Sequence, residues 1–129
     1  MGQQYLIDSN TVIDYLSGKL PHNGMLFLDQ LINNIPNISV ITKIEVLGYK
    51  TTLDASLLLN GFVDDSAVYA LSDEIVKKTI DIRKEHKIKI PDAIIAATAM
   101  TNGLVLISRN TKDFRIINGL EVSNPYELL

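Results

Sequence analysis

Residues 91–107 read PDAIIAATAMTNGLVLI and contain the signals that decide the fold. Pro91 suits the first turn of a helix. The residues that follow, as far as Asn102, are apolar on nearly every side, which is typical of a helix buried on most faces. Gly103 ends this helix, and Leu104–Ile107 is a fully apolar run of the kind expected in a buried strand. The stretch therefore predicts a buried helix, from Asp92 to Asn102, that leads into a buried strand.

The rest of the chain alternates short strands with helices in the same way. Further strands are predicted at Tyr5–Ile7, Ile38–Ile41, Ala67–Ala70 and Leu120–Val122, the last of them at an edge. Helices are predicted at Thr11–Ser17, Met25–Ile35, Thr42–Lys50, Leu53–Asn60 and Ser72–Lys87. This alternation predicts an α/β fold with three layers, α/β/α, around a central parallel sheet of four to five strands, in a single domain spanning residues 1–129.

Three residues are expected to set the ends of these helices. Thr42 and Ser72 are of the type that caps a helix N-terminus with its hydroxyl oxygen. Gly61 is expected to stop the helix that begins at Leu53.

The composition limits the kinds of site that the chain can hold. It contains no cysteine, and its two histidines, His22 and His86, stand far apart. This excludes disulfides and argues against a zinc site. A metal would therefore have oxygen ligands, which favours Mg²⁺ or Mn²⁺.

The distribution of charge and of apolar residues gives expectations about location and partners. Neither a signal-like leader nor an apolar run of about 18 residues occurs, so we expect a cytoplasmic protein with no membrane segment. The net charge of −3 argues against a protein that coats nucleic acid nonspecifically. It leaves room for a nuclease with a local basic strip.

Four acidic residues from distant parts of the chain are predicted at one edge of the sheet. Asp8 directly follows the first strand, and Glu45 lies in the first turn of the helix after the second. Asp92 begins the helix that leads into Leu104–Ile107, and Asp113 follows that strand by six residues. A helix that enters a parallel strand at its amino end must start near the carboxyl edge, where active sites of such sheets form.

Each of these acids also has a purely structural explanation. Asp8 could cap the first helix, Thr42-x-x-Glu45 matches a capping box, and Asp92 could interact with its helix dipole. Asp113 lies in RNTKDF, whose Asn and Asp suit a turn. We favour the functional explanation because four independent structural roles do not account for convergence on one edge.

Clustered carboxylates repel one another, and a cation relieves the repulsion. A hard divalent ion is the natural partner where Cys and His are absent. Mg²⁺ or Mn²⁺ held by carboxylates lowers the pKa of an attacking water and stabilises charge on a phosphate and its leaving oxygen. The cluster therefore predicts metal-dependent hydrolysis of phosphodiesters.

The segments that carry these acids resemble the motifs of the PIN domain family, especially the toxin ribonucleases of the VapC type. The similar segments are LIDSNTVIDYL (6–16), SVITKIEVLGY (39–49), IPDAIIAATAM (90–100) and GLVLISRNTKDF (103–114). The resemblance covers nearly the whole chain. It implies a Mg²⁺- or Mn²⁺-dependent endoribonuclease that acts on RNA, often as a homodimer, and is silenced by a cognate antitoxin protein.

The resemblance also suggests roles for individual residues. It implies Asp8, Glu45 and Asp92 as metal ligands, with Ser9 or Asn10 and Ser108 supporting them through hydrogen bonds. The fourth motif departs from the common pattern, because Asn110 stands where many PIN domains have an acid. Some toxin-type members place an acid before Phe instead, which matches Asp113. We therefore expect Asp113 to supply the fourth charge, with Asn110 in a supporting role.

Basic residues near the predicted edge are candidates for binding RNA phosphates. They are Lys43, Arg109, Lys112 and Arg115. A second basic group, between Lys77 and Lys89, is interleaved with acids, so we interpret it as a solvated helix face.

Two other functions remain open from the sequence. A haloacid-dehalogenase-like phosphatase also has an Asp after its first strand, but it needs a second acid two residues later, where this chain has Asn10. A PIN-like fold could also serve as a non-catalytic binding or scaffold module, a possibility supported only by the altered fourth motif.

Overall fold

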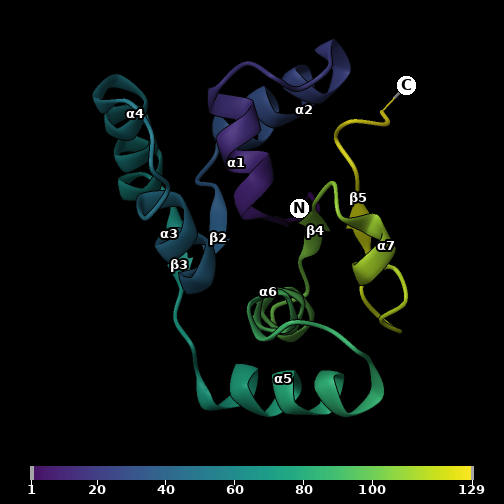
Figure 1. Ribbon diagram of the computed structural model, residues 1–129. Helices are drawn as coiled ribbons and strands as arrows, with labels where there is room; N and C mark the ends of the chain where they lie inside the picture. Colours follow the sequence, from purple (N-terminus) through teal and green to yellow (C-terminus); the bar gives the residue numbers. More distant parts are fainter. Residues whose placement is uncertain (1, 129) are drawn as a thin grey trace.

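The computed structural model describes residues 2–128 and alternates strands with helices along the chain (Figure 1). The strands are β1 (Tyr5–Ile7), β2 (Asn37–Ser39), β3 (Ala67–Tyr69), β4 (Val105–Ile107) and β5 (Val122–Ser123). The helices are α1 (Ser9–Leu16), α2 (His22–Ile32), α3 (Val40–Leu47), α4 (Leu53–Asp64), α5 (Asp73–Glu85), α6 (Ile90–Thr101) and α7 (Thr111–Phe114). The strands form one parallel sheet in the order β3-β2-β1-β4-β5, which confirms the predicted parallel sheet.

Successive side chains of a strand point to opposite faces of the sheet, so the core forms two clusters, one on each face. Leu6 and Leu106 belong to the cluster built with α5 and α6, whereas Ile7 and Ile107 belong to the cluster built with α1, α2 and α4. In Figure 1, α6 is seen end-on with α5 lying across it, and α1 and α2 lie on the opposite side of the strands. The predicted three-layer α/β/α arrangement is therefore confirmed.

Helix α6 has the buried character that its sequence predicts. Every residue from Ala93 to Ala99 is buried, and Pro91 lies in the first turn. Gly103 then adopts a positive φ of 65°, a conformation that favours glycine, and turns the chain into β4. The helix has 12 residues. Within residues 2–128, no helix combines the length and apolar character needed to cross a membrane.

The second strand ends earlier than the sequence predicts. The expected strand Ile38–Ile41 is wrong in its second half, because Val40 and Ile41 belong to α3. Ser39, not Thr42, caps α3: its Oγ accepts a hydrogen bond from Thr42 N at 3.1 Å. A run of β-branched residues fits a buried strand and a buried helix alike, so the position of the cap decides where the strand ends.

Helix α4 continues past the glycine that was expected to stop it. The prediction for Gly61 is wrong, because the next two residues, Phe62 and Val63, remain helical and are buried in the core. A glycine costs a helix about 1 kcal/mol, and burying two large apolar side chains stabilises the fold by more than that.

The remaining differences are shifts in the ends of elements. Helix α1 starts at Ser9, two residues before the predicted Thr11, because Asp8 caps it. Helix α2 starts at His22 and ends at Ile32, not at Met25 and Ile35, and β5 lies two residues beyond the predicted start at Leu120. Ser72 caps α5 as predicted, with its oxygen accepting from Ile75 N.

Candidate functional site

Asp8 lies at the carboxyl edge of the two central strands. Ile7 pairs with Ile107, and Asp8 N continues the ladder with a 3.0 Å bond to Ile107 O. The Asp8 carboxylate accepts from Ser9 N and from Ser108 Oγ, each at 2.7 Å. The residue is only 7% exposed. Asp8 thus caps α1 and, at the same time, presents a nearly buried carboxylate at the edge where strand β4 also ends.

Glu45 reaches the same edge from α3. Ser9 Oγ donates to Glu45 Oε1 at 2.6 Å and lies 3.1 Å from the Oγ1 of the buried Thr42. The predicted Thr42–Glu45 capping box is therefore absent, and Thr42 supports Ser9 instead. Since Ser9 N also bonds Asp8, this one serine connects two carboxylates that are 37 positions apart in the chain.

Asp92 and Asp113 complete the set from α6 and α7. Asp92 lies in the first turn of α6 and is partly buried, and Asp113 lies on the short helix α7. Asn110 caps α7 through its Oδ1, and its Nδ2 donates to Asp113 Oδ2 at 3.1 Å. The neighbouring Phe114 is fully buried. Asn110 and Phe114 thus hold Asp113 in place on α7.

Neighbouring acids act electrostatically on Asp8 and on Asp92. Burial raises the pKa of Asp8, the bonds from Ser108 and Ser9 lower it, and the charges of Asp92 and Glu45 raise it again. Burial also raises the pKa of Asp92, as do the charges of Glu45 and Asp113, while Lys89 lowers it. The charges of Glu45 and Asp92 therefore act on Asp8, and those of Glu45 and Asp113 act on Asp92, at one edge of the sheet.

This donor set suits a hydrated magnesium or manganese ion. The donors are carboxylate oxygens, and their mutual repulsion is what a divalent cation relieves. Within residues 2–128, no group of three or more acidic or histidine side chains is arranged so that it could hold a metal ion. Mg²⁺ usually binds proteins through one or two carboxylates with several waters retained, so the chemistry of these donors fits such an ion.

The raised pKa values predict how stability depends on pH. Since Asp8 and Asp92 bind protons more tightly when folded, the metal-free fold gains stability on acidification. It loses this stability as the pH rises from about 4 through the raised pKa values.

Thermal melts in chelator across this pH range should show a smaller loss of stability for Asp8→Asn than for the wild type. The exposed Asp64, at the end of α4, provides the control: Asp64→Asn should keep the wild-type slope. Equal slopes for Asp8→Asn and the wild type would contradict the shift at Asp8.

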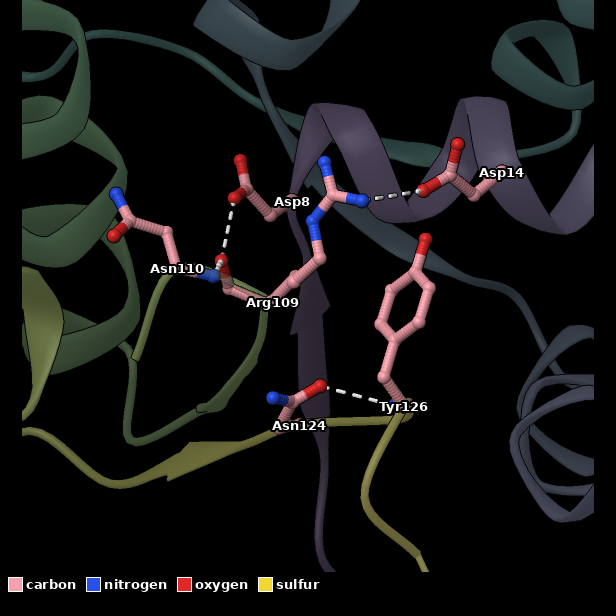
Figure 2. Close-up of polar contacts among 7 residues, drawn as sticks. Asp8, Asp14, Arg109, Asn110, Asn124 and Tyr126 are labelled. Atoms are coloured by element: carbon pink, nitrogen blue, oxygen red, sulfur yellow. Dashed lines mark hydrogen bonds and ion pairs between the residues drawn. The ribbon is translucent and has the colours of Figure 1, made fainter. Parts of the chain in front are cut away.

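The predicted RNA-binding residues differ in how they are held. Lys43, Lys112 and Arg115 are exposed on α3 and α7 or directly after α7. Arg109 also has an exposed side chain, but it lies 3.7 Å from the carboxylate of Asp14 and over the ring of Tyr126 (Figure 2). Asn10, a predicted supporting residue, is exposed, whereas Ser9 and Ser108 are buried and bonded to the carboxylates.

Sequence reasoning missed three residues near this edge. Thr42 appeared to be a helix cap, and only the position of Ser39 shows that its hydroxyl faces Ser9. Asp14 and Tyr126 contact Arg109 from α1 and from the C-terminal segment. Asp14 lies in the segment LIDSNTVIDYL, but a single acid on a helix does not indicate a contact with Arg109. Tyr126 lies in a segment without helical or strand periodicity, so no pattern predicted its position.

A comparison with family models finds one described as PIN domain over residues 5–120. This match spans most of the 129 residues and includes all four carboxylates. No curated protein matches the sequence.

Solved structures share the fold over almost the entire chain. A toxin–antitoxin complex from Klebsiella pneumoniae contains a chain with 33% identity and a TM-score of 0.79, covering 97% of this chain and 100% of that one. DNA-bound VapBC from Salmonella typhimurium matches with 23% identity and a TM-score of 0.80, covering 96% and 99%. FitAcB from Neisseria gonorrhoeae matches with 22% identity and a TM-score of 0.81, covering 97% and 100%.

Proposed function

The chain belongs to the PIN domain family, and on that premise we propose that it is a metal-dependent endoribonuclease, the toxin of a type II toxin–antitoxin pair. The observation that carries the proposal is the convergence of Asp8, Glu45, Asp92 and Asp113 on the carboxyl edge of the sheet, where Ser9 bonds to both Asp8 and Glu45. PIN nucleases generally use divalent metals, and the similar chain from Klebsiella pneumoniae comes from a toxin–antitoxin complex. RNA is proposed as the substrate from the resemblance to the VapC type.

In this proposal hydrogen bonds orient two of the carboxylates. Ser9 N and Ser108 Oγ orient Asp8, and Ser9 Oγ orients Glu45. Because these partners are themselves buried, the two carboxylates keep their orientation when a charged substrate approaches. Asp92 brings a third carboxylate from the first turn of α6.

Asp8, Glu45, Asp92 and Asp113 would hold Mg²⁺ or Mn²⁺, which when bound supplies an activated water and charge stabilisation for the phosphodiester. The protein's own contribution is to orient Asp8 and Glu45 through Ser9 and Ser108, although burial and neighbouring charges raise the pKa of Asp8. Lys43, Lys112 and Arg115 are placed on exposed surfaces of α3 and around α7, where they can contact RNA phosphates.

We also propose two protein partners. An antitoxin is supported by the toxin–antitoxin complexes among the similar structures. A homodimer follows from the resemblance to VapC-type toxins. An adjacent small gene encoding a DNA-binding protein would support the first, and a measurement of mass in solution tests the second.

Cleavage of RNA tests the proposed function. Purified protein should cut single-stranded RNA when Mg²⁺ or Mn²⁺ is added. If water is the nucleophile, the fragments carry no 2′,3′-cyclic phosphate, whereas a contaminating ribonuclease that uses the 2′-hydroxyl leaves one. Absence of cleavage in the presence of either metal would favour the non-catalytic scaffold, and release of phosphate from a small phosphomonoester would favour the phosphatase.

Metal binding should also be visible in the stability of the fold. A ligand that binds only the folded state, at about 100 times its Kd, adds about 2.7 kcal/mol. For a domain of this size that raises the Tm by roughly 10 °C. Thermal melts of chelator-treated wild type with and without millimolar Mn²⁺ measure the shift, and Asp64→Asn should show the same shift. An unchanged Tm would argue against metal binding at the carboxylates.

A further inference from the structure

The C-terminal segment after β5 is closely tied to the rest of the fold. The side chain of buried Asn124 accepts from Tyr126 N at 2.9 Å, which shapes a tight turn (Figure 2). Pro125 lies against α2 at Gly24, where an added Cβ would come within 2.2 Å of Pro125 O. Asn23 Nδ2 reaches Leu128 O at 3.4 Å. These contacts determine where the intervening Tyr126 stands.

Tyr126 stands under Arg109, which directly follows Ser108, the partner of Asp8. The guanidinium carbon of Arg109 lies 5.2 Å from the centroid of the Tyr126 ring, within the range of a cation–π contact. Asp14 approaches the same guanidinium from α1, at 3.7 Å, which is too long for a hydrogen bond. The donors of Arg109 therefore remain available, and its side chain is 57% exposed.

The hydroxyl and the ring of Tyr126 differ in what they contact. Within residues 2–128, it is one of two buried side-chain polar atoms that have no hydrogen-bond partner. A buried hydroxyl without a partner does not stabilise the fold. The contact with Arg109 is made by the ring, so the ring is the part of Tyr126 that acts on the edge of the sheet.

We propose that Tyr126 is a positioning residue whose ring holds Arg109 ready to bind an RNA phosphate beside the Asp8 carboxylate site. An arginine loses side-chain entropy when it is immobilised. A ring that restricts the guanidinium before RNA arrives reduces this loss on binding. The ion pair joins an exposed Arg109 side chain to a mostly buried Asp14 at a distance too long for a hydrogen bond, so the guanidinium can exchange it for a phosphate. The inference rests on the proposed function, because it takes the ligand bound at this edge of the sheet to be RNA.

Two measurements on four variants test this role. The first is binding of a short fluorescein-labelled single-stranded RNA in chelator, followed by anisotropy at several salt concentrations. The second is KM and kcat for cleavage with Mn²⁺. The variants are Arg109→Ala, Tyr126→Leu, the double variant, and Tyr126→Phe as the matched control that keeps the ring.

Arg109→Ala should weaken RNA binding about tenfold and lower the salt slope by about 0.7, the value for one phosphate contact with a single strand. Tyr126→Leu should weaken binding about two- to fivefold and raise KM with kcat unchanged. In the Arg109→Ala background, Tyr126→Leu should have no further effect, because Tyr126 acts through Arg109. Tyr126→Phe should bind RNA like the wild type.

The outcomes separate this inference from the proposed function. Additive losses in the double variant, or a loss in Tyr126→Phe as large as in Tyr126→Leu, would overturn the positioning role while leaving the nuclease intact. Wild-type binding by Arg109→Ala would do the same. If the variants change RNA binding as predicted but the wild type cleaves no RNA, the positioning of Arg109 is supported and the proposed nuclease function is overturned. Failure of the wild type to bind RNA would overturn both.

Discussion

Replacing Asp8 by Asn is expected to reduce RNA cleavage by more than about 100-fold and to leave the metal-free fold at least as stable as the wild type. Loss of a residue that merely orients a metal ligand commonly costs 10- to 100-fold, and Asp8 is proposed as a ligand itself. Asn keeps the helix cap, because its carbonyl oxygen can accept from Ser9 N, and its amide can donate to Ser108 Oγ. One charge fewer relieves a repulsion of about 1 kcal/mol.

The two measurements on Asp8→Asn must be made on the same sample. Cleavage kinetics report the catalytic role, and thermal melts in chelator report stability. If Asp8 served only as the cap of α1, activity would survive, since Asn caps a helix about as well as Asp. A large drop in Tm would show instead that the ionised carboxylate holds the fold together. Asp64→Asn, at an exposed position on α4, controls for the loss of a single charge.

Replacing Asp113 by Asn should reduce cleavage by about 10- to 100-fold at low Mn²⁺, with partial rescue as Mn²⁺ is raised. The charge of Asp113 reaches Asp92, so its removal leaves the cluster with less negative charge to attract a cation. Asn110→Ala should have a much smaller effect on the rate. It removes the cap of α7 and the bond to Asp113, which together cost stability of about 1 kcal/mol, but it removes no charge.

Single-turnover cleavage by both variants across a Mn²⁺ titration decides this point. Wild-type rates for Asp113→Asn would make Asp113 a turn residue and leave a site of three carboxylates. A larger defect in Asn110→Ala than in Asp113→Asn would mean that the turn, and not the charge, matters at this position. Melting curves of Asn110→Ala separate loss of the α7 cap from loss of function.

Strong local patterns in the sequence predicted most of the fold. The apolar helix α6 and the strand β4 after it could be recognised because burial on all sides leaves no polar face. The directions of the strands then placed Asp8, Glu45 and Asp92 at one edge, although the end of the second strand was predicted two residues too late. A residue that follows a parallel strand lies at the carboxyl edge of the sheet even when the predicted end of the strand is wrong by a few residues.

Contacts that depend on tertiary packing could not be predicted. Thr42 and Ser39 are both good caps, and only the burial of Thr42 beside Ser9 shows which one caps α3. Gly61 is a helix breaker locally, but the buried Phe62 after it keeps α4 intact. Tyr126 contacts Arg109 only because the C-terminal segment passes α2, and no local pattern encodes that path.

The central claim, that a divalent ion held by carboxylates hydrolyses RNA, is tested most directly by one measurement. Cleavage of single-stranded RNA is followed for wild type in excess chelator and again after Mn²⁺ is restored, with Asp8→Asn purified in parallel. The account predicts that the wild type is inactive in chelator and regains its activity with Mn²⁺, and that Asp8→Asn stays inactive in both. Cleavage by the wild type that persists after complete chelation, or equal cleavage by Asp8→Asn, would contradict it.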